Sequence, residues 1–176
     1  MNNTVKQKIS HSFEVLLTSR NFDDITVMNI VEASEISKAT FYRHFKDKYD
    51  ILDYVIKSSI DSFFEPYLKG DSLKTAHFNF HEYLYSKKEF FYRAMKTEGP
   101  NSFENSLIEA SIDLFYKIYE IKSVTVTNEI ADLTELYCRG AVAYLKKWII
   151  GGFKEPPEYI FKIAEKGIPE PIKKLI

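Results

Sequence analysis

Basic and hydroxyl side chains that could bind DNA are concentrated within residues 26–48, TVMNIVEASEISKATFYRHFKDK. Residues 37–48 contain four Lys or Arg residues and one acidic residue, although the whole chain carries a net charge of −1. Arg43 could make paired hydrogen bonds with the O6 and N7 atoms of guanine. Tyr42 and His44 could donate to phosphates, which positions a protein on DNA without reading its sequence. The chemistry indicated is recognition of a double helix rather than catalysis.

Two short helices are expected to carry these side chains. Thr26 suits the N-cap of a helix over Val27–Ala33, because its hydroxyl can accept a hydrogen bond from a free N–H group of the first turn. Ser37 suits the same role for a helix over Lys38–Phe45. Two short helices joined by about four residues are typical of a helix-turn-helix.

The second of these helices has an apolar face and a polar face. At about 100° per residue, Phe41 and Phe45 fall on the same side, where their rings can anchor the helix on a core. The major groove of DNA admits an α-helix, so the opposite face suits a base-pair groove. That outward face carries Lys38, Ala39, Tyr42 and Arg43. The residues alone leave open the alternative of a three-helix core with a basic, merely solvated face.

The run Ala33–Lys48, ASEISKATFYRHFKDK, resembles the helix-turn-helix of the TetR/AcrR family of transcriptional regulators, and the likeness covers most of residues 1–50. In that family the segment that matches Ser37–His44 enters the major groove. The resemblance implies that some of these side chains hold phosphates, as a lysine at a helix N-terminus can, and that the others lie at base edges. The implied DNA-binding residues are Thr26, Ser37, Lys38, Ala39, Thr40, Tyr42, Arg43, His44 and Lys48.

Two positions depart from the family pattern. Glu35 stands in the turn where glycine is usual, so this residue is expected to adopt a positive φ without glycine's freedom. Ala39 stands where glycine is common, which hinders a close approach to DNA slightly. Neither departure threatens the fold, and both leave the operator sequence open.

The rest of the chain has helical periodicity, and strand alternation is rare. The fold class expected is all-α: a three-helix helix-turn-helix DNA-binding domain over residues 1–50, fused to a helical dimerisation and ligand-binding domain over residues 51–176. The long helix that begins near Lys48 should belong to both halves and join them rigidly. The helices expected are Thr4–Ser19, 48–66, Ser72–Ser86, Lys87–Thr97, Ser102–Ile121, Thr127–Ile150 and 156–166.

The helix over Thr127–Ile150 has an apolar stripe that suits either the core or a dimer interface. Two-fold dimers are the commonest oligomers, and paired helix-turn-helix domains bind half-sites about one turn of DNA apart. Residues 137–150 also resemble the dimerisation helix of the regulators of dihydroxyacetone kinase operons within the same family. The stripe predicted as a homodimer interface is Leu133, Leu136, Tyr137, Gly140, Tyr144 and Trp148.

Aromatic residues make up 15% of the chain, which suggests an apolar cavity for a small-molecule effector. A binding cavity would need a few polar groups among the rings, and His81 and Glu82 are the candidates. Most of these rings could equally be core. The residues predicted to line the cavity are Phe64, Phe78, His81, Phe91, Phe103, Phe115 and Tyr119.

Several classes of function are not supported. The sequence has no G-x-S-x-G, G-x-x-x-x-G-K-[ST], H-E-x-x-H or C-x-x-C motif, so we expect no enzyme, no catalytic residues and no cofactor. His77 and His81 have a spacing that can bind metal, but no third ligand is evident, so we expect no metal. The lone Cys138 is expected to be a buried small hydrophobe. Without a membrane span or signal sequence, a cytoplasmic protein is expected.

These observations together predict a transcriptional regulator whose partners are double-stranded DNA, a second copy of the chain and a small-molecule effector, with no membrane partner. Repression from a pseudopalindromic operator, relieved by an apolar or aromatic effector, is the expected mode, because repression is the commoner output of the family. The alternatives are a transcriptional activator of the same family, and a helical protein-interaction module that binds no operator.

Overall fold

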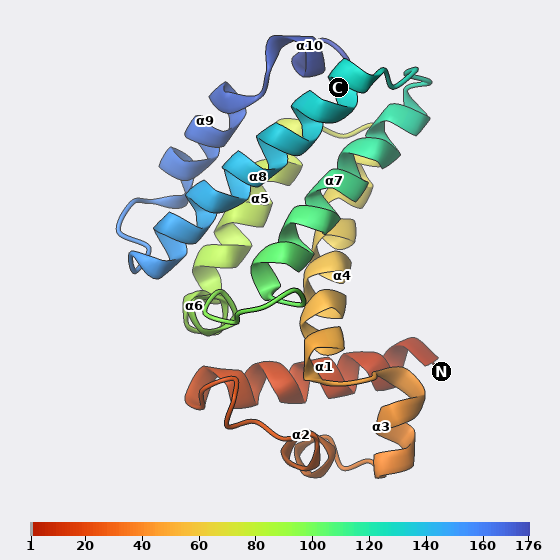
Figure 1. The fold of residues 1–176 in the computed structure, drawn as a ribbon, viewed down its shortest axis with the longest axis vertical. Coiled ribbons are helices and arrows are strands. Elements are labelled where there is room, and N and C mark those ends of the chain that lie inside the picture. Colours follow the sequence, from red (N-terminus) through yellow and green to blue (C-terminus); the bar gives the residue numbers. More distant parts are fainter. Residues whose placement is uncertain (1) are drawn as a thin grey trace.

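The computed structural model describes residues 2–176, and every regular element within that range is an α-helix (Figure 1). The all-α prediction is therefore confirmed for the described residues. The helices are α1 (Asn2–Ser19), α2 (Val27–Ala33), α3 (Lys38–His44), α4 (Lys48–Leu68), α5 (Leu73–Ser86), α6 (Lys88–Ala94), α7 (Phe103–Ile121), α8 (Asn128–Ile150), α9 (Pro157–Gly167) and α10 (Glu170–Lys173).

Helix boundaries differ from the expected ones at several places: α1 begins at Asn2, α6 ends at Ala94 rather than Thr97, and two further differences have physical reasons. α4 continues through Pro66 to Leu68. A proline in the last turn removes only one backbone donor, and the Lys69 N–H group still donates to the carbonyl of Glu65, so the helix is not broken at Pro66. The C-terminal tail, for which no helix was expected, contains the short α10, which begins after Pro169.

Helices α1, α2 and α3 pack into a three-helix unit at one end of the molecule, called the head below (Figure 1). Its centre consists of side chains with no exposed surface, among them Ile9 and Phe13 of α1, Ile30 of α2 and Phe41 of α3. Burial of such side chains, at about 1.5–3 kcal/mol each, is the main force that holds the short helices α2 and α3 in place.

Helix α4 connects the head to the larger helical bundle formed by α4–α9 (Figure 1). Its first turn, capped by Asp47, packs near α1, and its later turns pack on α5 and α7. A second link runs from α1 to α6, where Lys87 forms an ion pair with Glu14. The head is thus attached to the bundle through two separate contacts.

The bundle has a main core that is continuous with the head and a smaller cluster around Phe115, Tyr119, Cys138 and Ile172. Among the described residues, no helix is both long and apolar enough to cross a membrane.

Candidate nucleic-acid interface and buried cavity

One side of helix α3 packs against the core of the head, and the opposite side is exposed to solvent. Ser37 caps its N-terminus by accepting a hydrogen bond from the Thr40 N–H group at 3.0 Å. Phe41 has no exposed surface, and its ring centroid lies 6.3 Å from that of Phe45, which is also buried. The buried rings set the rotation of the helix about its axis, because they leave one side of α3 against the core and the other in solvent.

The solvent side of α3 carries the side chains predicted for it. Lys38, Ala39 and Arg43 are exposed, and Tyr42 is 52% exposed. The Lys38 ammonium lies 6.0 Å from the centroid of the Tyr42 ring, a cation–π arrangement that favours the exposed position of the ring. His44, at the end of the helix, is half-buried. The arrangement presents cationic and hydrogen-bonding groups on one exposed face of α3.

The turn between α2 and α3 has the geometry that its sequence suggested. Glu35 has φ +49°, so the expected positive φ is confirmed. Ser34, which precedes it, is buried and donates through Oγ to the carbonyl oxygen of Ile30 at 2.6 Å. The turn places a non-glycine residue in the left-handed region at a modest energetic cost.

Thr26 caps α2 as predicted. Its Oγ1 accepts from the Asn29 N–H group at 3.2 Å, and Asn29 Oδ1 accepts from the Thr26 N–H group at 3.0 Å. This reciprocal pair is a capping box. Thr26 remains exposed at the edge of the head.

Lys48 has a structural role that sequence reasoning missed. Its ammonium donates to the carbonyl oxygens of Phe22, Ile25 and Asp23 at 2.6, 3.0 and 3.3 Å and lies 4.3 Å from the centroid of the Phe22 ring. Partial burial lowers the pKa of the Lys48 ammonium, and the nearby Asp23 and Asp24 oppose this shift. The ammonium joins the start of α4 to the loop before α2, so it is already engaged within the head.

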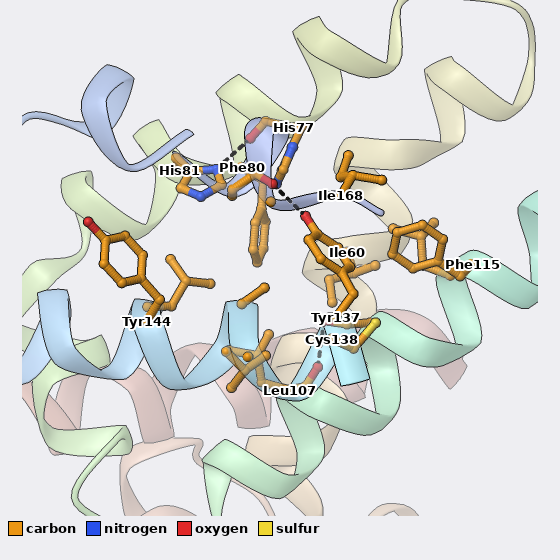
Figure 2. Close-up of a pocket in the computed structure, with 18 of the residues that line it drawn as sticks. Ile60, His77, Phe80, His81, Leu107, Phe115, Tyr137, Cys138, Tyr144 and Ile168 are labelled. Carbon is orange, nitrogen blue, oxygen red and sulfur yellow. Dashed lines mark hydrogen bonds between the residues drawn. The ribbon is translucent and has the colours of Figure 1, made fainter. Parts of the chain in front are cut away.

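The bundle contains a partly open apolar cavity of about 490 Å³, lined by residues of α4, α5, α7, α8 and α9 (Figure 2). This volume is within the roughly 300–1,000 Å³ typical of small-molecule sites. Of the described residues that line the cavity, none is Lys, Arg, Asp or Glu. The wall includes Gly140, Ile163 and Leu136, which are exposed at the surface of α8 and α9.

Three of the residues predicted to line the cavity do so: Phe64, His81 and Phe115. The prediction was wrong for Phe78, Phe91, Phe103 and Tyr119, which the structure places elsewhere in the described bundle.

Each of these four side chains has a different neighbour. Phe91 and Phe103 pack on each other, 5.8 Å between centroids, in the solid core. The Tyr119 hydroxyl lies 2.8 Å from Thr134 Oγ1 in the smaller cluster. Phe78 packs against Phe161. Helical periodicity shows that a ring is inward, but it does not show whether that side adjoins a void.

Most of the wall was missed by sequence reasoning, including the ring side chains of His77, Phe80, Tyr137 and Tyr144. The spacing of His77 and His81 was a usable signal, although it was considered only for metal binding. Within the described residues, no group of three or more His, Cys, Asp or Glu side chains is placed to hold a metal ion.

The two histidines are neutral members of an aromatic cluster on α5. Their ring centroids are 4.8 Å apart, and the centroid of Phe161 lies 5.4 Å from that of His77. Burial, and secondarily the neighbouring His81, lower the pKa of His77 to about 3. Burial also lowers the pKa of His81, although a hydrogen bond to the His77 carbonyl opposes the shift. Figure 2 shows both rings at the same side of the cavity.

The cysteine in the wall is unreactive. Cys138 is buried, and burial raises the pKa of its thiol to about 12. The thiolate, which is the nucleophile and metal ligand, is therefore scarce at neutral pH.

The stripe on α8 divides between surface and core. Leu136 is 70% exposed and Gly140 is exposed, whereas Leu133 and Tyr144 are half-buried. Tyr137 is also half-buried and donates to the Ala164 carbonyl at 3.0 Å.

Trp148 was expected on the dimer surface, but the structure places it inside the subunit, 3% exposed. Its indole N–H donates to the Glu155 carbonyl at 2.8 Å, and its ring packs on Phe153 and Tyr85. The loop after α8 folds back over this end of the helix, which periodicity within α8 could not reveal.

Comparison with known proteins gives family matches over most of the chain. Residues 14–55 match the family model described as "Bacterial regulatory proteins, tetR family". Residues 71–169 match the model TetR_C_8, described as "Transcriptional regulator C-terminal region". Among curated proteins, no match reaches significance.

Several solved structures share the fold over nearly their whole length. The dihydroxyacetone kinase operon activator DhaS has 16% identity, 97% coverage of both chains and a TM-score of 0.67. A TetR transcriptional regulator from Streptococcus agalactiae has 16% identity, 96% coverage of both chains and a TM-score of 0.65. A putative TetR-family regulator from Syntrophomonas wolfei has 19% identity, covers 100% of this chain and 98% of its own, and gives a TM-score of 0.57.

Proposed function

The chain belongs to the TetR family of transcriptional regulators, so it is a DNA-binding regulator and not an enzyme, and we propose that it acts as a homodimer on a pseudopalindromic operator. The observation that carries this proposal is the orientation of α3. Phe41 is completely buried, whereas Tyr42, the next residue, is 52% exposed beside exposed lysine and arginine side chains.

In the proposed complex, α3 enters the major groove. Arg43 reads a guanine, and Ala39 and Thr40 lie against base edges or a thymine methyl. Thr26, Tyr42 and His44 donate to phosphates and hold the register. The remaining contacts come from Ser37 and Lys38, and Lys48 contributes its positive charge.

Lys48 has a particular place in this scheme. Its ammonium already bonds three carbonyls of the head, so it supports the phosphate-binding surface as well as adding charge to it.

The second copy is proposed to pack against α8 and α9. In a dimer, each short α3 helix contacts one half-site, and the two contacts together are enough for specific binding. A two-fold dimer also matches the symmetry of a pseudopalindrome. Large apolar side chains are exposed on these two helices: Leu136, Ile150, Tyr159 and Ile163. Of the stripe on α8, Leu133, Leu136, Tyr137, Gly140 and Tyr144 remain proposed interface residues, and Trp148 supports the interface from inside the subunit.

An effector in the cavity is proposed to change the spacing of the two heads. Helix α4 supplies Ile60 and Phe64 to the cavity wall, and its first turn packs against the head. A ligand that binds one arrangement of α4 more tightly than another shifts the population towards it, by no more than its difference in affinity. We propose repression relieved by the effector; activation is the second candidate, because the structurally similar DhaS is named an activator.

The test is a mobility-shift titration of the dimer, with its mass measured by light scattering, on the DNA upstream of its own gene. We expect specific binding at physiological salt and, for Arg43→Ala, a loss of about 1–3 kcal/mol of discrimination at one guanine. Lys154→Ala, which removes an exposed cation from the α8–α9 connection, is the matched control and should bind normally. A confirmed dimer with nonspecific affinity alone would instead support a protein-interaction module.

A further inference from the structure

The wall of the cavity restricts the charge of any ligand. The part of the wall that the structure describes contains no Lys, Arg, Asp or Glu side chain. Both imidazoles in the wall are neutral, because burial lowers their pKa values. An ionised ligand group placed against this wall would therefore lose its hydration without gaining an opposite charge. Charged metabolites are disfavoured, and a neutral ligand fits.

Two polar groups of the wall already donate to backbone oxygens. Ser111 Oγ donates to the Leu107 carbonyl at 2.7 Å. The Tyr137 hydroxyl donates to the Ala164 carbonyl at 3.0 Å. The hydrogens of both hydroxyl groups are therefore already used in hydrogen bonds within the protein. These two groups contribute little to fixing the orientation of a bound ligand.

His81 differs from these two residues, because one of its ring nitrogens is buried and has no hydrogen-bond partner among the described residues. The side chain is 1% exposed, and its Nδ1 lies 2.8 Å from the carbonyl oxygen of His77. A carbonyl oxygen can only accept, so Nδ1 carries the hydrogen. In the neutral ring, Nε2 is then an acceptor, and among the described residues it has no hydrogen-bond partner. A buried acceptor without a donor is a costly feature for a protein to keep.

A trapped water is a poor partner for this nitrogen. A buried water usually needs about two to four polar partners. The groups around His81 are mainly rings, with the centroids of His77, Phe161 and Phe80 at 4.8, 6.2 and 6.3 Å. Figure 2 shows the His81 ring at the edge of the cavity, on the same side as His77. The missing donor therefore suits a molecule that also fills the apolar space.

We propose that the cavity binds a neutral, largely apolar molecule carrying a hydroxyl group, which donates a hydrogen bond to Nε2 of His81. This inference rests on the proposed effector-binding function and specifies its ligand class. The hydroxyl fixes the orientation of the ligand, and the apolar remainder packs against Phe64, Phe80 and Phe115 of the wall.

The test compares three probes of similar size by calorimetry: 4-propylphenol, 4-propylanisole and 4-propylbenzoate. The phenol is neutral and has a donor, the anisole is neutral and has none, and the benzoate is charged. We expect the phenol to bind at least about tenfold more tightly than the anisole, which corresponds to one hydrogen bond of about 1.4 kcal/mol. The benzoate should not bind measurably.

Variants locate the preference at His81. His81→Leu should bring the affinities for the phenol and the anisole to within about twofold, while the folded state is kept because an unpaired acceptor is replaced by an apolar group. His11→Leu, on the exposed side of α1, is the matched control and should keep the tenfold preference. Ala141→Phe, which fills the cavity, should abolish binding of every probe.

Three results would overturn the inference: no probe binds the wild-type protein, the anisole binds as tightly as the phenol, or the preference survives in His81→Leu. A mobility-shift assay without probe separates this outcome from failure of the proposed function. Loss of operator binding with an intact phenol preference would refute the regulator's proposed operator and leave the ligand class standing.

Discussion

Helices α3 and α5 both carry polar side chains on one face, but they use them in opposite ways. The polar face of α3 is in water and keeps its charges on Lys38 and Arg43. The polar face of α5 adjoins a cavity, and its histidines lose their charge through burial. The comparison teaches that helical periodicity identifies a face, whereas the surrounding packing decides whether that face can carry charge.

The sharpest test of this contrast uses two adjacent residues of α3. Phe41→Ala should lower the free energy of unfolding by about 3–5 kcal/mol, because it leaves a cavity beneath the helix. Tyr42→Ala should change it by about 0.5 kcal/mol or less, because the ring is exposed. Both variants should lose operator binding. Urea denaturation and mobility shift measure the two effects, and equal destabilisation by the two substitutions would show that α3 is not oriented as described.

Substitution of Lys48 tests whether a cation in the head contributes to the free energy of unfolding. Lys48→Met should lower the free energy of unfolding by about 1.5–3 kcal/mol, because it removes charged hydrogen bonds to three carbonyls. The matched variant Lys46→Met removes an exposed cation and should leave stability nearly unchanged. Chemical denaturation of both variants decides the matter; similar midpoints would mean that the Lys48 ammonium contributes charge alone.

The neutral state of the α5 histidines predicts a pH dependence. The pKa of His77 is about 3 in the folded protein against an ordinary value of 6.5, so below pH 6.5 the unfolded chain binds the proton more readily. Stability is therefore full above pH 6.5 and is lost progressively as the pH falls towards 3, by about 2 kcal/mol between pH 7 and pH 5.

The His77→Phe variant removes this contribution. Its free energy of unfolding should fall less than that of the wild-type protein over the same pH range, by about that amount. His11→Phe, at an exposed position on α1, should follow the wild-type curve. Parallel curves for wild type and His77→Phe would show that the folded protein does not hold His77 neutral.

The smallest expected effect concerns one hydroxyl on the open face of α3. Tyr42→Phe should leave stability unchanged and weaken operator binding about three- to tenfold, as expected for one lost phosphate hydrogen bond. The loss should be similar for every operator sequence, because a phosphate contact carries no sequence information directly. Fluorescence anisotropy on two unrelated operators measures it, and a loss limited to one sequence would indicate base contact instead.

The head could be predicted in more detail than the bundle. The caps Thr26 and Ser37, the positive φ of Glu35 and the buried position of Phe41 all followed from residues within a few positions along the chain. In the bundle, the same reasoning placed Phe91 and Phe103 at a cavity, although they pack in the solid core. Helical periodicity shows which side of a helix faces inward, but it does not distinguish a cavity from a packed neighbouring side chain.

The sequence by itself determined most of the helices, the caps Thr26 and Ser37, the exposed face of α3 and the family, because these depend on local hydrogen bonds and on a contiguous motif. Tertiary structure alone decided the rest: the bonding of Lys48 to a loop over twenty residues earlier, the burial of Trp148 under the segment that follows α8, and the unpartnered nitrogen of His81 beside a cavity. Those features arise where distant segments meet, and the helical repeat carries no information about which segments those are.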